Sequence, residues 1–353
     1  MTKKKIVHVG IDLGTSRTVI SCDNGVRTCV ASFVGYPKDA VSSKLIGREV
    51  VFGEEALKYR MALDLYKPLD KGVIKHSDSS TGADAAMRDK SFDATRHLLK
   101  HMINLVLEDE PDPDQVIIRG VIGAPALASL KNKKAIIDIA RGIINDVMVA
   151  SEPFTVAYGM NMLFNTLVID IGAGTVDLCR MHGTMPTEED QITTFKAGDY
   201  IDQLFLDLIR KKYTEANFSI NMVKKFKEEN AAVTNEGEQI CIELPVKGKP
   251  VIHDVTHELK TACKAIVPDI VEGVRSLVAS FDPEFQDELK KNIVLAGGGS
   301  QIIGLKKEIE VYMKNTLGYG RVTKVEEPLF AGANGALLLS KDMPDEYWDE
   351  LNI

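Results

Sequence analysis

Two short stretches of this 353-residue chain place an acidic residue directly before a glycine-containing turn. The first is DLGT, Asp12 to Thr15, and the second is DIGAGT, Asp170 to Thr175. Each follows an apolar, β-branched run that predicts a buried strand, at residues 6–11 and 167–171. Glycine lets a backbone N–H approach an anion closely because it has no Cβ, and threonine adds a hydroxyl donor. The two turns therefore predict phosphate-binding loops.

The two carboxylates give the predicted site a second component. An acidic side chain at the end of each strand would repel a bare phosphate. Asp12 and Asp170 are therefore expected to hold Mg²⁺ through its water molecules, with the metal bridging the phosphates. Two hairpins that grip one metal-bound triphosphate are consistent with this combination.

A third glycine turn follows a third apolar strand, expected at residues 292–296, and its sequence is GGGS, Gly297 to Ser300. One such turn alone is usually an ordinary turn, but three of them, with the first two forming an internal duplication, favour a nucleotide site. The P-loop pattern GxxxxGK[ST] is absent, and so is GxGxxG preceding a helix. These absences argue against P-loop and dinucleotide-binding folds.

The remaining patterns predict the elements that carry these turns. Ser91 is expected to cap a helix that ends before Pro111, and a mobile surface loop is expected over residues 75–90. An apolar stripe over residues 136–147 predicts another helix, and Ser151-Glu152-Pro153 is expected to open a short one. Further along, a hairpin is expected over residues 243–254, and helices over residues 255–278, 303–313 and 330–339.

Composition limits the classes of function. The net charge of −8 disfavours binding to nucleic acid and to anionic lipid, since both rely on Lys and Arg. The five cysteines form no CxxC pair and have no zinc-ligand spacing, which indicates reduced thiols in a cytoplasm. No segment is apolar over the roughly 18 residues that a membrane helix needs, so direct membrane insertion is not expected.

These motifs together resemble the actin, Hsp70 and sugar-kinase superfamily. The stretches GIDLGTSRT and VIDIGAGTVDL resemble its two phosphate motifs, and LAGGGSQIIGL resembles its adenosine motif. GVIGAPA and PLFAGANGALL resemble its two connecting segments. Within the superfamily the chain is most similar to bacterial actins of the MreB group, and among these to the actins that form magnetosome filaments. The stretches VGYPKD, SEPF and the PDEYW tail carry that closer similarity.

The resemblance implies an α/β, actin-like bilobed ATPase fold with two related domains around a nucleotide cleft. The first lobe would comprise residues 1–150, with an insertion at about 34–70, completed by a C-terminal helix at about 328–353. The second would comprise residues 151–327, with an insertion at about 191–254.

The resemblance also implies ATP and Mg²⁺ as cofactors and assigns roles residue by residue. Phosphate, metal or adenosine contacts are implied for Asp12, Gly14, Thr15, Asp170, Gly172, Gly174, Thr175, Gly297, Gly298 and Ser300. Asp170 would also hold the attacking water, so it counts as catalytic.

Two further assignments have a structural alternative. Glu152 matches the glutamate that positions the hydrolytic water, and its alternative is a carboxylate favoured at a helix start. Lys227 and Glu228 match a pair that contacts adenine and ribose, and their alternative is a solvated charged helix face.

The function implied is an ATPase whose filaments scaffold and position magnetosomes in the cytoplasm. Its partners would be further copies of the chain and adaptor proteins on magnetosomes. A bacterial actin for cell shape or plasmid segregation is an alternative. A small-molecule kinase is another, but it needs a catalytic aspartate in a sugar-binding region, for which no candidate stands out. A chaperone-type ATPase is a third, but it would normally carry a further substrate-binding domain.

Overall fold

A computed structural model of the chain describes residues 4–71, 73–75, 82–234 and 239–350. Its contacts divide the chain into two compact units. Unit 1 comprises Met1–Leu163 together with Leu329–Ile353, and unit 2 comprises Phe164–Pro328. The C-terminal segment of the chain is therefore part of the same unit as the N-terminal half.

Unit 1 is built on a five-stranded mixed sheet with the strand order β10-β9-β1-β2-β3. Strands β1, β9 and β10 run parallel, whereas β2 and β3 continue from β1 as antiparallel neighbours. The bounds are β1 Lys5–Leu13, β2 Arg17–Cys22, β3 Arg27–Ala31, β9 Val116–Ala124 and β10 Asp146–Ser151. The carboxyl ends of the three parallel strands therefore meet at one edge of the sheet.

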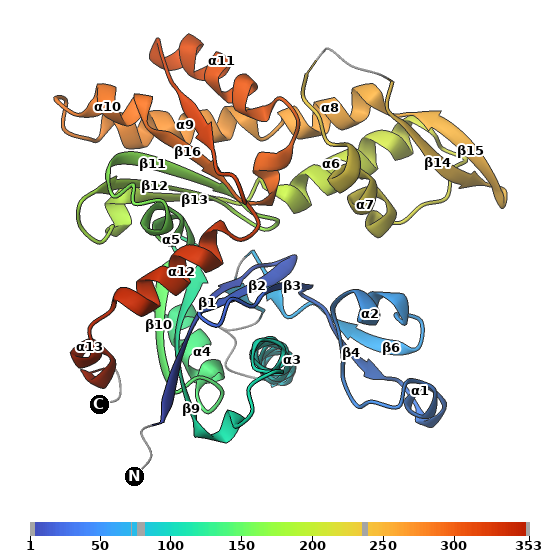
Figure 1. Ribbon diagram of the computed structural model, residues 1–353. Coiled ribbons are helices and arrows are strands. Elements are labelled where there is room, and N and C mark those ends of the chain that lie inside the picture. Colours follow the sequence, from blue (N-terminus) through green and yellow to red (C-terminus); the bar gives the residue numbers. More distant parts are fainter. Residues whose placement is uncertain (1–3, 72, 76–81, 235–238, 351–353) are drawn as a thin grey trace. The chain divides into compact units, whose positions relative to one another are not determined.

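Side-chain alternation along β1 gives the sheet of unit 1 two different faces. Val7, Val9 and Ile11 point into an apolar core that also contains residues of α3 (Gly82–Val106) and α4 (Leu130–Ala140). On the other face, Gly10 lies against α12 (Ala331–Asp342), so closely that an added Cβ would lie 2.1 Å from the Ala333 carbonyl oxygen. Helix α12 also packs on α5 (Glu152–Gly159), as Figure 1 shows.

Two smaller parts complete unit 1. A three-stranded sheet of order β5-β4-β6 packs with helices α1 and α2, and β7 pairs with β8. The bounds are β4 Val34–Pro37, α1 Ala40–Ile46, β5 Val51–Phe52, α2 Gly53–Lys58, β6 Leu63–Tyr66, β7 Leu69–Asp70 and β8 Val73–Ile74. A single 3₁₀ turn, Pro113–Gln115, precedes β9. At the other end, α13 (Asp345–Glu350) buries Trp348, over which the Arg119 guanidinium lies 5.8 Å from the ring centroid.

Unit 2 repeats the strand–turn–strand start on a second five-stranded sheet, of order β13-β12-β11-β16-β17. Strands β11, β16 and β17 run parallel, and β12 and β13 are antiparallel. The bounds are β11 Phe164–Ile171, β12 Val176–His182, β13 Gln191–Thr194, β16 Ile293–Ala296 and β17 Val322–Lys324. One 3₁₀ turn, Glu188–Asp190, lies before β13, and another, Gly298–Gln301, follows β16.

Helices and a hairpin surround the sheet of unit 2. The apolar residues of the sheet share one core with α6, α8, α9 and α11. The bounds are α6 Gly198–Lys212, α7 Ile220–Asn230, β14 Cys241–Val246, β15 Lys249–Asp254, α8 Thr256–Lys264, α9 Val267–Ala279, α10 Gln286–Lys291 and α11 Leu305–Leu317. The hairpin β14–β15 turns at Lys247 and Gly248, both with positive φ, which confirms that prediction.

Two sequence-based element predictions are wrong. Helix α3 begins at Gly82, so the loop expected over residues 75–90 is helical from there, while residues 76–81 lie outside the described residues. Ser91 is therefore inside the helix, where its hydroxyl donates to the Met87 carbonyl oxygen at 3.0 Å. The helix expected over residues 136–147 ends at Ala140, because Gly142 has φ +80° and the chain then enters β10.

The two units also differ from the expected lobe boundary. The second lobe was expected to begin at residue 151, whereas α5 lies in unit 1. The physical reason is its close packing on α12, where a Cβ added to Gly159 would lie 2.9 Å from the Gly335 Cα.

Candidate functional site

In unit 1 the sheet register brings Asp12 and Glu152 to the same edge. Asp12 of β1 lies opposite Gly123 of β9, which in turn lies opposite Ala150 of β10. Glu152 follows β10 directly as the first residue of α5. A Cβ added to Gly123 would lie 3.2 Å from the Glu152 Cγ and 3.9 Å from the Asp12 Cα. The two predicted site residues thus flank one glycine at the carboxyl end of three parallel strands, where α/β proteins bind ligands.

The turn between β1 and β2 is closed tightly at Gly14. A Cβ added there would lie 2.5 Å from the Arg17 carbonyl oxygen, so no larger residue fits this turn. The Ser32 hydroxyl donates to the Gly14 carbonyl oxygen at 2.7 Å and also lies 3.0 Å from the Thr18 hydroxyl. No sequence pattern predicted Ser32 as part of the site, because its connection to the turn depends on the pairing of β2 with β3.

The Asp12 carboxyl lies beside the first turn of α12. A Cβ added to Gly332 would lie 3.3 Å from the Asp12 Oδ2. Burial raises the pKa of this carboxyl to about 6. A nearby cation favours the charged form of a carboxyl, so this group is suited to a site that becomes occupied by a cation.

In unit 2 the register places Asp170 beside the third glycine turn. Asp170 of β11 lies opposite Ala296 of β16, and Gly297 follows Ala296 with φ +75°. A Cβ added to Gly297 would lie 2.3 Å from the Asp170 Oδ1 and 2.4 Å from the Ile171 carbonyl oxygen. In the same turn the Ser300 hydroxyl donates to the Gly297 carbonyl oxygen at 2.7 Å. The residues assigned to the metal and to adenosine are therefore neighbours within this unit.

The second predicted phosphate turn, Gly172 to Thr175, is held by backbone hydrogen bonds. The Gly172 N–H donates to the Thr175 carbonyl oxygen at 2.9 Å and closes the turn. The first residues of α6 then bond to it: the Gly198 N–H donates to the Gly172 carbonyl oxygen at 3.1 Å, and the Asp199 N–H donates to that of Ala173 at 2.7 Å. Thr175, like Thr15 in unit 1, is buried.

Lys227 and Glu228 lie differently, although they are adjacent on α7. Lys227 is buried, and its Nζ lies 2.8 Å from the Asp202 Oδ1 and donates to the Gly198 carbonyl oxygen at 3.3 Å. A solvated helix face is therefore wrong for Lys227, whereas Glu228 is exposed. Burial raises the pKa of Asp202, and the charge of Lys227 opposes that rise. No sequence pattern predicted Asp202 as part of the site.

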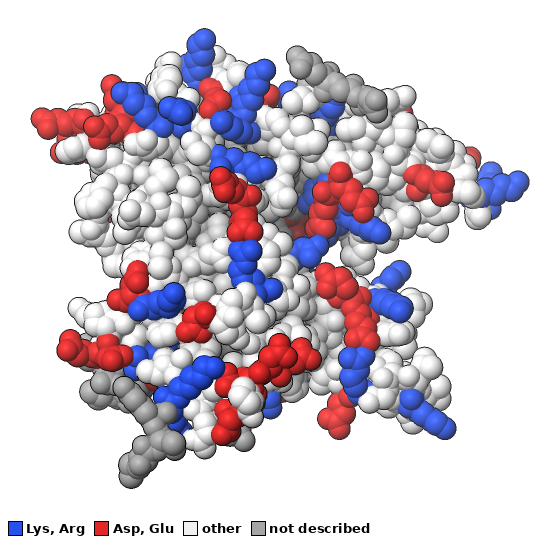
Figure 2. All heavy atoms as spheres, in the orientation of Figure 1, with Lys and Arg blue, Asp and Glu red and all other residues white. Residues whose placement is uncertain are grey.

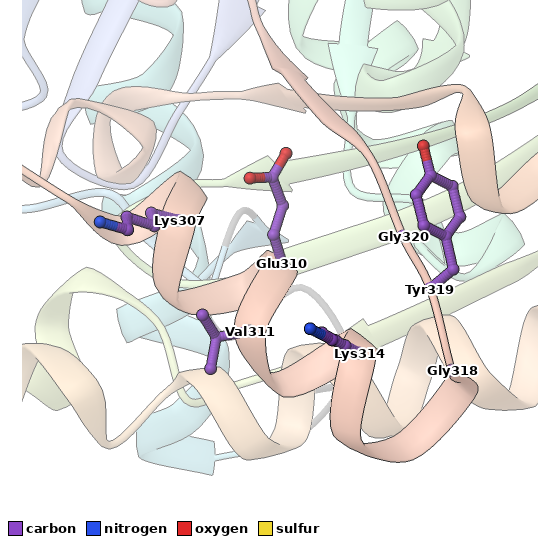
Figure 3. A pocket seen from close by; sticks show the side chains of 7 residues that line it. All are labelled: Lys307, Glu310, Val311, Lys314, Gly318, Tyr319 and Gly320. Atoms are coloured by element: carbon purple, nitrogen blue, oxygen red, sulfur yellow. The ribbon is translucent and has the colours of Figure 1, made fainter.

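A separate surface hollow of about 330 Å³ lies along α11. Lys307, Glu310, Val311, Lys314 and the Gly318–Gly320 segment line it (Figure 3), so it contains none of the predicted nucleotide residues. Lys and Arg side chains gather over α11 on the face shown in Figure 2. Glu310 is already engaged, because its Oε1 accepts a hydrogen bond from the Val322 N–H at 2.9 Å.

Two properties of the described residues concern metals and membranes. Residues 4–71, 73–75, 82–234 and 239–350 contain no cluster of three or more His, Cys, Asp or Glu side chains that could hold a metal ion. Mg²⁺ commonly keeps several waters and takes only one or two carboxylates, so isolated aspartates suit it better than a full protein cage would. Within the same part of the chain, no helix combines the length and apolar character needed to cross a membrane.

The duplicated strand–turn–strand units, each with an aspartate at the strand end, define an actin-like fold. The sequence pattern of the MreB/Mbl protein family matches residues 6–346, and the chain belongs to that family. It is 40% identical to the actin-like protein MamK of Paramagnetospirillum magneticum over 348 residues, which is 99% of this chain and 96% of that protein.

Solved structures agree with this membership. A MamK double helical filament superposes with a TM-score of 0.88 at 40% identity, covering 96% of this chain and 100% of that one. A non-polymerising MamK mutant bound to AMPPNP has a TM-score of 0.71, also at 40% identity, over 96% of this chain and 100% of the other. The predicted fold class and the resemblance to bacterial actins, including those of magnetosomes, are confirmed.

Proposed function

We propose that this chain is an ATPase that binds ATP with Mg²⁺ and assembles into filaments that position magnetosomes. The observation that carries the proposal is the pair of equivalent strand ends. Asp12 and Asp170 are each the second-last residue of a strand that leads into a tight glycine turn, and each has a glycine of a neighbouring segment packed against it. The relationship to MamK, which forms double helical filaments, supports the assembly step.

The residues present fit a nucleotide with a divalent cation. Added side chains at Gly14, Gly297 or Gly299 would collide with backbone or side-chain atoms, so these turns keep their conformation only with glycine. Backbone N–H groups of the turns at Gly14 and at Gly172 to Thr175 would bind the phosphates. Asp12 and Asp170 would hold the waters of Mg²⁺, which neutralises charge on the phosphates when bound. The MamK structure with AMPPNP supports a nucleotide of this class.

Glu152 is the residue we assign to hydrolysis. Its carboxylate would orient the attacking water and accept its proton, which is the role of a general base. Asp170 would assist by holding the same water. Gly297, Gly298 and Ser300 would bind adenosine, together with Glu228, whereas Lys227, which the sequence had paired with Glu228 in that role, is buried against Asp202.

For the cell, we propose a cytoplasmic filament whose subunits are copies of this chain. Adaptor proteins on magnetosomes would connect the filament to the organelles. The name and sequence of MamK support this assignment over a cell-shape or plasmid-segregation actin.

Electron microscopy and sedimentation of the purified chain with ATP and Mg²⁺ test the proposal. Filaments that pellet with ATP, together with phosphate release, support it. A chain that stays monomeric by light scattering well above micromolar concentrations, across salts and nucleotides, would refute the filament. Sugar-dependent ADP formation would instead indicate a small-molecule kinase.

A further inference from the structure

An ion pair between α6 and α7 lies next to the start of α6, which is hydrogen-bonded to the second phosphate turn. Lys227 of α7 and Asp202 of α6 are both buried, with 2.8 Å between Nζ and Oδ1. A second and looser pair joins the same helices, because the Lys224 Nζ lies 3.9 Å from the Asp199 Oδ1. Helix α7 therefore contacts the first two turns of α6 through two lysines.

The same lysine also reaches the backbone at the start of α6. The Lys227 Nζ donates to the Gly198 carbonyl oxygen at 3.3 Å. The N–H group of the same peptide, that of Asp199, donates to the Ala173 carbonyl oxygen, and the N–H group of Gly198, in the preceding peptide, donates to the Gly172 carbonyl oxygen. A continuous series of polar contacts thus leads from Asp202 through Lys227 and Gly198 to the turn.

Gly198 at the start of α6 packs closely against the second phosphate turn. A Cβ added to Gly198 would lie 3.1 Å from the Ala173 Cα and 3.2 Å from the Gly172 carbonyl oxygen. The start of α6 therefore rests on the turn by direct backbone contact. Any shift of α6 therefore moves the N–H groups that hold the Gly172 and Ala173 carbonyl oxygens of the turn.

We propose that Asp202 is a positioning residue for nucleotide binding, which acts through Lys227 to hold the phosphate turn in place. This inference rests on the proposed ATP site, and it adds a role for the ion pair that differs from direct contact with adenosine. Asp202 fixes the Lys227 ammonium against the Gly198 carbonyl. In its absence the start of α6 loosens, and the turn loses its orientation toward the phosphates.

The test compares ATP and adenosine binding to the full chain by calorimetry. Asp202→Asn should weaken ATP binding about tenfold, the loss expected when roughly one hydrogen bond of positioning is removed, and leave adenosine within about twofold. The matched control is Lys212→Met. Lys212 lies at the other end of α6, and its Nζ forms an ion pair with the buried Glu258 at 2.9 Å, which the substitution removes. Lys212→Met should lower the melting temperature but should not weaken ATP binding more than adenosine binding.

Amide hydrogen exchange without nucleotide gives a second readout. In Asp202→Asn, the amides of Gly198 and Asp199 should exchange faster, because they donate the bonds that reach the turn. If this variant does not fold, Gly198→Ala perturbs the same contact and should give the same loss specific to ATP. Equal losses of ATP and adenosine, or unchanged exchange at both amides, would overturn the positioning role. If the wild-type chain fails to bind ATP, the proposed function fails, while the exchange measurement still decides whether the contact holds the turn.

Discussion

The backbone of Gly297 lies against the carboxylate of Asp170. These residues are 127 positions apart in the sequence (297 − 170), and the parallel pairing of β11 with β16 brings them together. A Cβ on Gly297 would lie 2.3 Å from the Asp170 Oδ1. Gly297, assigned to adenosine, and Asp170, assigned to the metal, are therefore in direct contact. A substitution at Gly297 should displace the Asp170 carboxylate.

Gly297→Ala should destabilise unit 2 and weaken ATP binding. Gly297 has φ +75° and ψ 167°, a region that is almost exclusive to glycine, and the added methyl would also collide with Asp170 and Ile171. We expect a loss of about 3 kcal/mol or more in the free energy of unfolding, from backbone strain and overpacking together. Gly318→Ala is the control, because its φ is +76° with no atom within 4 Å of an added Cβ. Equal losses of unfolding free energy in the two variants would contradict a collision of the added methyl group with Asp170 and Ile171.

Glu152→Ala should abolish ATP turnover but leave ATP binding and assembly largely intact. The phosphate turns lie at Gly14, Gly172 and Gly174, so the phosphate contacts should survive. Loss of a general base lowers the rate by roughly 10²- to 10⁴-fold. Filaments should then persist, because the ATP state no longer decays, and disassembly should slow.

Phosphate release and pelleting on the same preparation decide between the two roles of Glu152. Asp287→Ala is a suitable control, since Asp287 is also an acidic residue in the first turn of a helix. Asp170→Ala should resemble Glu152→Ala but bind metal less tightly. Near wild-type hydrolysis by Glu152→Ala would refute the catalytic assignment. Failure to bind ATP at all would show that the residue stabilises the helix start.

Chemical reactivity should distinguish one cysteine from the other four. Cys241 is exposed, whereas Cys22, Cys179 and Cys263 are buried and Cys29 is half-buried. Burial raises the pKa of Cys22 to about 11 and that of Cys263 to about 12, which lowers their thiolate fraction. A thiol reagent should therefore modify one thiol per native chain rapidly. Cys241→Ser should remove that fast phase, and a second fast thiol in this variant would contradict the burial.

Local sequence patterns were sufficient for the turns and the hairpin, but not for contacts made between distant segments. The strand ends at Asp12 and Asp170 were predictable because apolar β-branched runs and glycine turns act locally. The end of α4 was missed, although Gly142 provided a stop signal for the helix. The start of α3 was missed because serine is typical of a helix start, whereas the Ser91 hydroxyl donates to the Met87 carbonyl oxygen inside the helix.

The parts of the candidate site that sequence analysis missed all depend on tertiary packing. Ser32 reaches the Gly14 carbonyl oxygen only because β3 pairs with β2. Asp202 is buried with Lys227 only because α6 packs on α7. No spacing rule along the chain relates either residue to a phosphate turn.

The buried pair of Arg180 and Asp190 should make the stability of unit 2 depend on pH. Their side chains lie 2.8 Å apart. Burial raises the pKa of Asp190, but hydrogen bonds from Thr187, Arg180 and His182 outweigh it and lower the pKa to about 2. The folded pKa is thus below the ordinary value of 3.8, so this stabilisation is complete above about pH 4 and is lost as pH falls toward 2.

Asp190→Asn tests that dependence. At neutral pH the variant leaves Arg180 without its buried partner and should lose about 3–5 kcal/mol of unfolding free energy. The difference from wild type should shrink as the pH falls below about 4, as chemical denaturation at a series of pH values would show. Asp287→Asn, which breaks the pair between the exposed Asp287 and Lys290, should change the free energy of unfolding much less. A difference for Asp190→Asn that stays constant down to pH 2 would exclude the linkage.

Gly335→Ala should lower both the stability of unit 1 and the rate of ATP hydrolysis. Helices α5 and α12 cross at Gly335, where an added Cβ would lie 1.7 Å from the Thr155 carbonyl oxygen, so the helices must separate to admit a methyl group. Overpacking of this kind costs about 1–3 kcal/mol. The Thr155 hydroxyl donates to the Glu152 carbonyl oxygen at 2.8 Å, so a displaced α5 also displaces the proposed base. A misplacement of about 1 Å can reduce a rate up to roughly 10²-fold.

Thermal unfolding and phosphate release, measured together, separate the two effects of Gly335→Ala. ATP affinity should change less than the hydrolysis rate, because the proposed phosphate turns are not part of this helix crossing. Gly25→Ala is the control: its φ is +92°, and no atom lies within 4 Å of an added Cβ, so it should cost only backbone strain and leave turnover unchanged. A Gly335→Val variant should be worse than Gly335→Ala on both measures, because the helices must move further apart. A Gly335→Ala protein with wild-type stability would show that α5 and α12 do not cross this closely. It would also refute the proposal that α12 positions Glu152 through α5.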